Sequence, residues 1–235
     1  MQMIYTDFQP YLLSDTDAWA LSSDKAIELL SYLESCGVRQ VFCVPPVKQE
    51  NPENTAEFLK KRFVQLQEGY AGGMELKLGA RYRLDEGFGA VLKSDCLLTI
   101  GGERELLVDV SPLVESADCW RMLEAIVQAG YTPVVMQPER TIYWCTEDFF
   151  RLKEMGCQLM LNGYSLFGYN GDEALNYSRM LLKKEMYTYL CSGMEDVKVM
   201  RYSEQMTTGE DAVLTNGVQV LEQNNRLLWS VNESG

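Results

Sequence analysis

Histidine is absent from the 235 residues of this sequence. The absence bears on residues 7–22, DFQPYLLSDTDAWALS, which begin like a buried strand, continue as an aspartate-rich loop and end at a helix cap. Metal-binding active sites often have this form, and the imidazole of histidine is the commonest metal ligand. The stretch is therefore either a working site built from other groups or the remnant of one.

Long apolar runs and clusters of basic residues are also missing. No segment approaches the roughly 18 consecutive apolar residues of a membrane span, and the first residues, MQMIYTDFQ, have neither the basic nor the apolar region of a signal peptide. We therefore expect a soluble, cytoplasmic protein without membrane insertion. The net charge of −13 would repel a phosphate backbone, and no Lys/Arg cluster offsets it, so nucleic acid is not an expected partner.

Paired cysteines are lacking as well. The seven cysteines form an odd set without a C-x-x-C motif, and most lie beside apolar residues. They are typical of small core side chains in a reducing compartment, and they predict neither disulfides nor a zinc finger. With 46% hydrophobic residues the chain can bury one large core, so we expect a single domain over residues 1–235.

Short β-rich runs alternate with longer segments of helical periodicity. Strands are predicted at residues 3–8, 38–44, 75–82, 96–100, 105–110, 132–137, 157–162 and 187–192. Helices are predicted at residues 22–37, 54–69, 116–130, 146–156 and 171–185, several with a cap such as Asn54 at the start and a glycine at the end. This alternation predicts parallel strands inside a shell of helices, either an open doubly wound sheet or a barrel. In both, the reactive face lies at the carboxyl ends of the strands.

The most specific motifs follow those strand ends. GARYRLDEGF (residues 79–88), the PER of QPER (138–140) and SLFGYNG (165–171) resemble, in order and spacing, the bacterial PHP-fold (polymerase and histidinol phosphatase type) protein tyrosine phosphatases of capsule and exopolysaccharide clusters. The resemblance covers nearly the whole chain. It implies a distorted TIM-like (β/α)7 barrel whose pocket holds metal ions, usually manganese, that activate water to attack phosphotyrosine on a kinase tail. The family's ending, a helix and an asparagine-rich turn, resembles the stretch through NNRLLW, and we expect a helical cap from about residue 201.

The metal-ligand positions of that family are largely changed here. Asp7 and Asp17 match its aspartates, Asp109 keeps an acid in place of glutamate, and Arg140 keeps an arginine. Seven ligand positions differ, and they carry Gln9, Tyr11, Pro46, Arg81, Gln137, Gly193 and Glu195. Of these replacements only Glu195 offers a strong ligand for a hard metal, so no metal cluster is expected, and the alternative is a single Mg²⁺ or Mn²⁺ ion.

Less specific interpretations of the same residues remain open. Asp7 could end a strand, Asp15 and Asp17 could form turns, and Arg81 and Arg140 could be ordinary surface residues. The matched motifs favour a vestigial pocket instead. A guanidinium of Arg81 between Asp7 and Asp109 would replace the charge of the metals. Arg81 and Arg140 together could bind an anion such as phosphotyrosine.

Two further motifs are interpreted as structural. Residues 145–151 have the C-x5-R spacing of cysteine-dependent phosphatases, but their two acids and two phenylalanines oppose phosphate, and the segment reads as a helix start. Gly101-Gly102 is interpreted as a turn between two strands because the other glycines of a phosphate loop are missing.

Three functions remain in view. The first is a catalytically inactive homologue, a pseudophosphatase that regulates polysaccharide biosynthesis by binding a partner such as a tyrosine kinase tail. The second is a residual metal-dependent phosphatase that uses Asp7, Asp17, Asp109 and Glu195 around one cation. The third is a structural subunit that assembles with an active paralogue or with itself. The sequence leaves the oligomeric state open.

Overall fold

The strands form two parallel sheets. The computed structural model describes residues 5–94, 96–102, 104–194 and 212–230. The first sheet has the order β1-β2-β4 and the second the order β3-β5-β6-β7-β8-β9, and every adjacent pair is parallel. The strands are β1 (Thr6–Gln9), β2 (Gln40–Cys43), β3 (Pro46–Val47), β4 (Glu75–Leu78), β5 (Arg81–Arg83), β6 (Glu105–Asp109), β7 (Thr132–Met136), β8 (Gln158–Asn162) and β9 (Tyr189–Cys191). The predicted α/β fold with parallel strands is confirmed.

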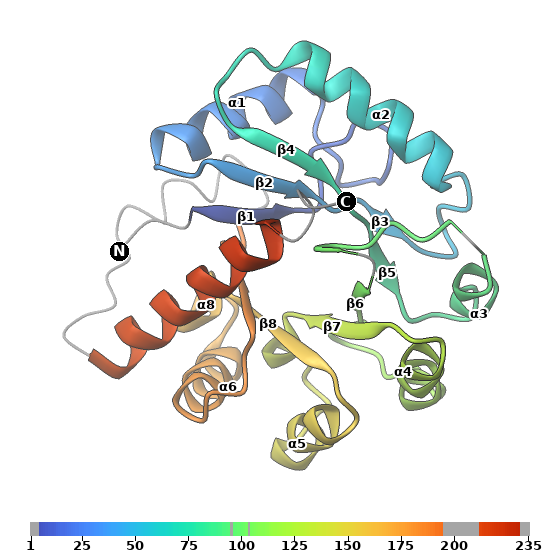
Figure 1. Cartoon of the computed structure of the whole chain (residues 1–235). Helices are drawn as coiled ribbons and strands as arrows, with labels where there is room; N and C mark the ends of the chain where they lie inside the picture. The colour runs from blue at the N-terminus through green and yellow to red at the C-terminus, as the bar shows by residue number, and fades with distance from the viewer. Residues whose placement is uncertain (1–4, 95, 103, 195–211, 231–235) are drawn as a thin grey trace.

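Helices connect the consecutive strands, except between β2 and β3 and between β4 and β5, and lie outside them (Figure 1). The α-helices are α1 (Ser23–Ser35), α2 (Ala56–Gly69), α3 (Phe88–Leu92), α4 (Cys119–Gln128), α5 (Thr146–Glu154), α6 (Asp172–Lys183) and α8 (Ala212–Ser230), and two 3-10 helices are η1 (Pro138–Arg140) and η2 (Gly163–Phe167). In the part of the chain that is described, none of the helices combines the length and apolar character needed to cross a membrane.

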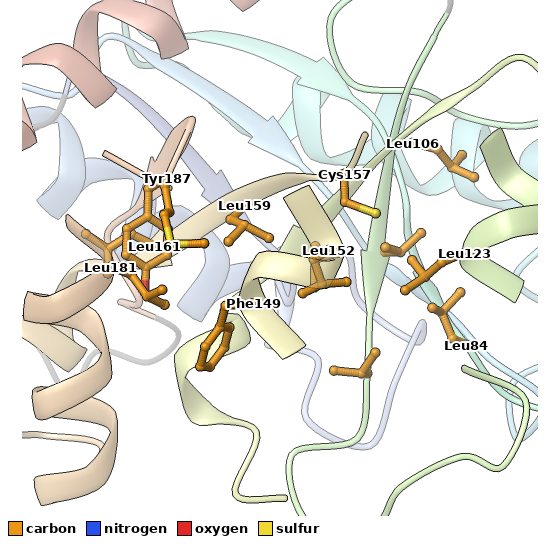
Figure 2. Close-up of a cluster of buried hydrophobic side chains, with 14 of the residues drawn as sticks. Leu84, Leu106, Leu123, Phe149, Leu152, Cys157, Leu159, Leu161, Leu181 and Tyr187 are labelled. Atoms are coloured by element: carbon orange, nitrogen blue, oxygen red, sulfur yellow. The ribbon is translucent and has the colours of Figure 1, made fainter. Parts of the chain in front are cut away.

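Strand β8 shows why parallel strands read as continuous apolar runs. Its side chains alternate between two faces, and both faces are buried. Leu159 and Leu161 pack on the helical side with a cluster that includes Leu152 of α5 (Figure 2). Met160 belongs to an inner cluster that also contains Leu107 of β6. Strand β8 therefore stabilises the fold through two separate apolar layers.

One predicted strand is interrupted and one strand was not predicted. Residues 75–82 give the two strands β4 and β5, and β3 follows the strand predicted at residues 38–44, which gives β2. The break between β4 and β5 falls at Gly79-Ala80, where a Cβ on Gly79 would lie 2.8 Å from the Ile100 side chain. On the two sides of this break, β4 and β5 pair in different sheets.

The strand predicted at residues 96–100 is wrong. These residues are irregular, although the backbone N–H of Ala80 donates to Leu98 O at 3.2 Å and that of Ile100 to Glu105 O at 2.9 Å. Gly101 and Gly102 both have positive φ and form the predicted turn, but only β6 follows as a strand. The apolar residues cover neighbouring strands instead of extending a sheet.

Two local predictions at helix termini have different outcomes. The cap of α2 is Thr55 and not the predicted Asn54, because the Thr55 side chain accepts from the Phe58 N–H at 3.3 Å. The predicted helix start at Cys145 is confirmed, since Cys145 caps α5 and its N–H donates to Asp148 Oδ2 at 2.8 Å.

The asparagine-rich turn expected near the C-terminus is also wrong. Helix α8 continues through it to Ser230 because the Asn225 side chain is fully buried and bonds to two strands. Its Nδ2 donates to Thr6 O at 3.1 Å and to Leu190 O at 2.7 Å, and its Oδ1 accepts from the Leu190 N–H at 3.3 Å. Asn225 thus joins β1 to β9, and the start predicted for the cap, near residue 201, lies outside the described residues.

Candidate functional site

Asp7 is the second residue of β1, and its fully buried carboxylate accepts three hydrogen bonds. Its Oδ1 accepts from the Ser192 N–H at 2.7 Å, and its Oδ2 accepts from Ser192 Oγ and Gln9 Nε2, each at 2.7 Å. Burial raises the pKa of Asp7, and the hydrogen bonds from Ser192 and Gln9 oppose that rise. Polar donors therefore satisfy this carboxylate. Ser192 was not predicted, although it directly precedes Gly193 in the matched closing motif.

Asp17 lies in the loop after β1 and pairs with a lysine. Lys48 Nζ is 2.6 Å from Asp17 Oδ2, the Asn51 amide donates to the same oxygen at 3.1 Å, and the Trp19 N–H donates to Oδ1 at 2.9 Å. Burial acts to raise the pKa of Asp17, but the hydrogen bond and charge of Lys48 bring it below its ordinary value. This carboxylate holds the loop after β1 to the residues after β3.

Asp109 at the end of β6 faces two arginines of β5. Its Oδ2 lies 2.8 Å from Arg83 Nη2 and 3.7 Å from Arg81 Nε. Arg81 is buried and also donates through Nη2 to the Tyr11 hydroxyl at 3.2 Å. The sequence predicts Arg81 between Asp7 and Asp109. The structure places Arg81 against Asp109, and Asp7 bonds to Gln9 and Ser192 instead.

Arg83 is a site residue that the sequence reasoning missed. It lies two residues after Arg81 in the same strand, and side chains at i and i+2 project from the same face of a strand. This i, i+2 spacing within GARYRLDEGF is the sequence signal that could have identified Arg83 as a site residue.

Gln137 and Arg140 follow β7 and line the same cavity as Arg81 and Asp109. Gln137 has a left-handed backbone, with φ of 54°, and its side-chain oxygen accepts a short hydrogen bond from Arg140 Nη1. Its Nε2 lies 3.7 Å from the Cys191 sulfur. The position at which the sequence resemblance implies a histidine therefore holds an amide that orients an arginine.

The turn that carries Arg140 is anchored by a buried acid. Glu139 Oε1 accepts from the Asn162 N–H at 3.0 Å and from Ser165 Oγ at 2.8 Å, and Oε2 accepts from the Tyr187 hydroxyl at 2.9 Å. Burial raises the pKa of Glu139, against the effect of these hydrogen bonds. Glu139 thereby fixes η1 against β8 and η2, and so positions Arg140.

These side chains enclose a small polar cavity of about 140 Å³. Its polar lining comprises Tyr11, Arg81, Arg83, Asp109, Gln137 and Arg140, with Thr141 at the end of η1. Three arginines and one carboxylate thus line this cavity, in a chain whose net charge is −13. A cavity of this size and charge suits a small oxyanion.

The remaining predicted positions lie apart from this cavity or outside the described residues. Pro46 is buried in β3, where its carbonyl accepts from Asn54 Nδ2 at 2.7 Å. Gly193 has φ of 79°, and a Cβ there would lie 2.1 Å from Asn162 Oδ1, so a side chain at this position would require a local shift. Glu195 falls within residues 195–211, which the structure does not describe.

The described residues do not fit a metal cluster. Within the described ranges, no group of three or more Cys, Asp or Glu side chains is arranged to hold an ion. Asp17 has Lys48 as its partner and Asp109 has two arginines, and bringing a divalent cation beside these groups would place like charges together. A hard-metal site here would require these ion pairs to break first.

Comparison with known proteins assigns the chain to a family. Residues 5–212 match the family model described as "Capsular polysaccharide synthesis, CpsB/CapC". No curated protein matches the chain. A solved chain from work on YwqE from Bacillus subtilis and CpsB from Streptococcus pneumoniae, described as unique metal-dependent tyrosine phosphatases, superposes with a TM-score of 0.73 at 19% identity, over 93% of this chain and 94% of that one. At that identity the likeness shows the fold, and the family match shows that this chain belongs to the CpsB/CapC family of capsular polysaccharide synthesis.

Proposed function

We propose that this CpsB/CapC protein is a pseudophosphatase: it binds a phosphate ester such as phosphotyrosine without hydrolysing it, and acts in capsular or exopolysaccharide biosynthesis by binding. The observation that carries the proposal is the convergence of Arg81, Arg83 and Arg140 on one cavity of about 140 Å³ at the strand ends. Charge-assisted hydrogen bonds from guanidinium groups match phosphate oxygens in geometry and charge. The partner on this proposal is a phosphorylated segment, such as a tyrosine kinase tail.

The chemistry of the cavity favours binding over hydrolysis. Metal-dependent hydrolysis needs an ion that lowers the pKa of bound water, and the solved relative is described as metal-dependent. Here Asp7 accepts hydrogen bonds from Ser192 and Gln9, while Asp109 pairs with arginines. On this proposal Arg81, which lies 3.7 Å from Asp109, turns toward an entering phosphate more readily than the closely paired Arg83.

We also infer that the two sheets line one distorted (β/α)7 barrel, in a single domain over residues 1–235. Side chains from both sheets support this, since Phe42 of β2 and Met160 of β8 share the inner apolar cluster. Asn225 supports it too, because it bonds to β1 and β9, the outermost strands of the two sheets.

Binding and catalysis are separated by one pair of experiments. Isothermal titration of the purified protein with a phosphotyrosine peptide should give saturable binding, and the unphosphorylated peptide should give none. Turnover of p-nitrophenyl phosphate, measured with and without Mn²⁺ beside elemental analysis, should show no metal-dependent rate. Manganese-dependent turnover that is lost in Asp7→Ala would establish the residual phosphatase instead.

A second candidate function is assembly with another copy or with a paralogous phosphatase. It is favoured by large apolar side chains exposed on loops near the strand ends: Trp19 is 75% exposed, Leu113 69% and Ile142 56%. The Ile142 N–H donates to Pro112 O at 3.0 Å, which brings two of these loops together. Light scattering distinguishes this function, since assembly with itself predicts a mass above 26.8 kDa.

A further inference from the structure

Three large apolar side chains lie exposed at the edge of the cavity that the three arginines line, which we call the arginine cavity. Leu113 and Val114 are each 69% exposed, and Ile142 is 56% exposed. These three residues form what we call the apolar patch. Large apolar side chains grouped on a surface mark an interaction site, because their transfer out of water is favourable.

Hydrogen bonds hold the two loops of the patch together. The Ile142 N–H donates to Pro112 O at 3.0 Å, and the Tyr143 hydroxyl donates to Ser111 O at 2.7 Å. The Val114 N–H donates to Ser111 Oγ at 3.2 Å, which closes the turn after β6. The loop after β6 and the loop after η1 therefore present the patch as one surface.

The same two loops form part of the wall of the arginine cavity. Pro112 lines the cavity and directly precedes Leu113. Thr141 also lines it and directly precedes Ile142. Thr141 is 2% exposed, and its hydroxyl makes no hydrogen bond to another described residue, so a phosphate oxygen in the cavity can accept from it. Because consecutive Cα atoms are about 3.8 Å apart, a phosphate ester bound there lies next to the patch.

A groove of about 570 Å³ continues from the arginine cavity. The groove and the cavity share Arg83 and Val110, and Val114 of the patch also lines the groove. The groove therefore gives a bound peptide chain a path past the patch. Glu86 and Glu115 line it too, so an acidic segment would meet like charges there.

We propose that the apolar patch binds a large apolar side chain next to the phosphorylated residue of the partner. The partner is then a phosphorylated segment with uncharged, apolar neighbours. This inference rests on the proposed function, because the arginine cavity must hold the phosphate. Residues 110–114 and 141–143 include no charged side chain, so a charged neighbour would lose hydration there without gaining an ion pair. An apolar neighbour gains the burial of its own surface and of the patch.

A second copy of the chain fits the patch less well than a phosphorylated segment does. Two copies would bring together two chains that each carry a net charge of −13. The charge of a phosphorylated segment is instead neutralised by the arginines of the adjoining cavity.

The test compares two phosphotyrosine peptides of equal length and charge, which carry either leucine or serine on both sides of the phosphotyrosine. Isothermal titration uses the full-length protein. We expect the leucine peptide to bind about tenfold more tightly, as partial burial of one leucine side chain would give. The unphosphorylated leucine peptide should show no saturable binding below about 1 mM, because the patch alone is too small to hold it.

Two leucine variants locate this preference. Leu113→Ser should weaken binding of the leucine peptide by about threefold to tenfold and leave binding of the serine peptide unchanged. Leu227→Ser is the matched control, because Leu227 is a 58% exposed leucine of α8 that lines neither the cavity nor the groove. This control should leave both affinities unchanged. Circular dichroism checks that both variants fold.

The outcomes separate this inference from the proposed function. Equal affinities of the two phosphorylated peptides would overturn the inference and leave the proposed function standing. No saturable binding of either peptide would overturn the proposed function and the inference with it. If Leu113→Ser lowers the mass in light scattering and leaves the peptide preference unchanged, the patch is an interface between copies and the inference is wrong.

Discussion

Arg83 and Asp109 occupy paired positions on the adjacent parallel strands β5 and β6, and Arg83 Nη2 lies 2.8 Å from Asp109 Oδ2. The Asp109 carboxylate is thereby bound to a guanidinium. Arg81 adds a second guanidinium at 3.7 Å. An ion pair thus stands where the sequence resemblance implies a metal ligand, and this relationship gives the sharpest prediction.

Asp109→Asn should increase the affinity for a phosphotyrosine peptide by about tenfold. The substitution removes the negative charge that competes with phosphate for Arg81 and Arg83, while it keeps the size of the side chain. Isothermal titration at fixed ionic strength measures the change. In a metal-dependent phosphatase the same substitution would lower the affinity, because Asn is a poorer ligand for a divalent cation. Weaker peptide binding by Asp109→Asn would therefore contradict the proposed function.

Arg140→Ala should weaken the same binding by about 10-fold to 100-fold, the range expected for the loss of a charge-assisted hydrogen bond. Arg121→Ala is the matched control, since Arg121 is an exposed arginine of α4 paired with Asp118. Titration of both variants under one set of conditions separates a local contact from the loss of one positive charge. Equal weakening in the two variants would show that Arg140 acts only through net charge.

Asp7 should make the folded state less stable as the pH rises through the Asp7 pKa. Burial raises that pKa above its ordinary value of 3.8, so between the two values the folded state binds more protons than the unfolded state. The contribution of Asp7 to the free energy of unfolding is then highest at and below the ordinary pKa. It falls as the pH rises and stays low above the raised pKa.

Asp7→Asn removes this titration. The wild-type free energy of unfolding minus that of Asp7→Asn should increase as the pH is lowered from 7 toward the ordinary pKa of Asp7. Urea denaturation across this range measures both proteins. A difference that shrinks on acidification would mean that hydrogen bonds from Ser192 and Gln9 hold the folded pKa below the ordinary value.

Asn225→Ala should lower the free energy of unfolding by about 2 to 4 kcal/mol, because it leaves buried backbone groups of Thr6 and Leu190 without their side-chain partner. Gln223→Ala, at an exposed position of the same helix, should change it by less than about 0.5 kcal/mol. Urea denaturation compares the two. Similar small effects would show that α8 docks through its apolar residues alone.

The sequence predicts the order of the elements well because buried parallel strands leave continuous apolar runs. It fails where one segment's conformation depends on a distant one. Residues 96–100 have the composition of a strand but cover neighbouring strands. Asparagine is typical of turns, but Asn225 lies within a helix because its side chain bonds to β1 and β9.

In the candidate site, too, local motifs could be predicted and contacts between distant segments could not. Arg81, Asp109 and Arg140 could be predicted because each occupies a matched motif position. Ser192 and Lys48 were missed because their roles depend on contacts between distant segments. Ser192 bonds to Asp7, 185 positions away, and Lys48 pairs with Asp17, 31 positions away. Glu195 stays a prediction.

Diffraction from crystals grown with both Mn²⁺ and phosphate tests the central claim most directly. The account predicts a phosphate among Arg81, Arg83 and Arg140, and no anomalous manganese peak beside Asp7 or Asp109. Two or more manganese peaks at these carboxylates, with the arginines turned away, would contradict it.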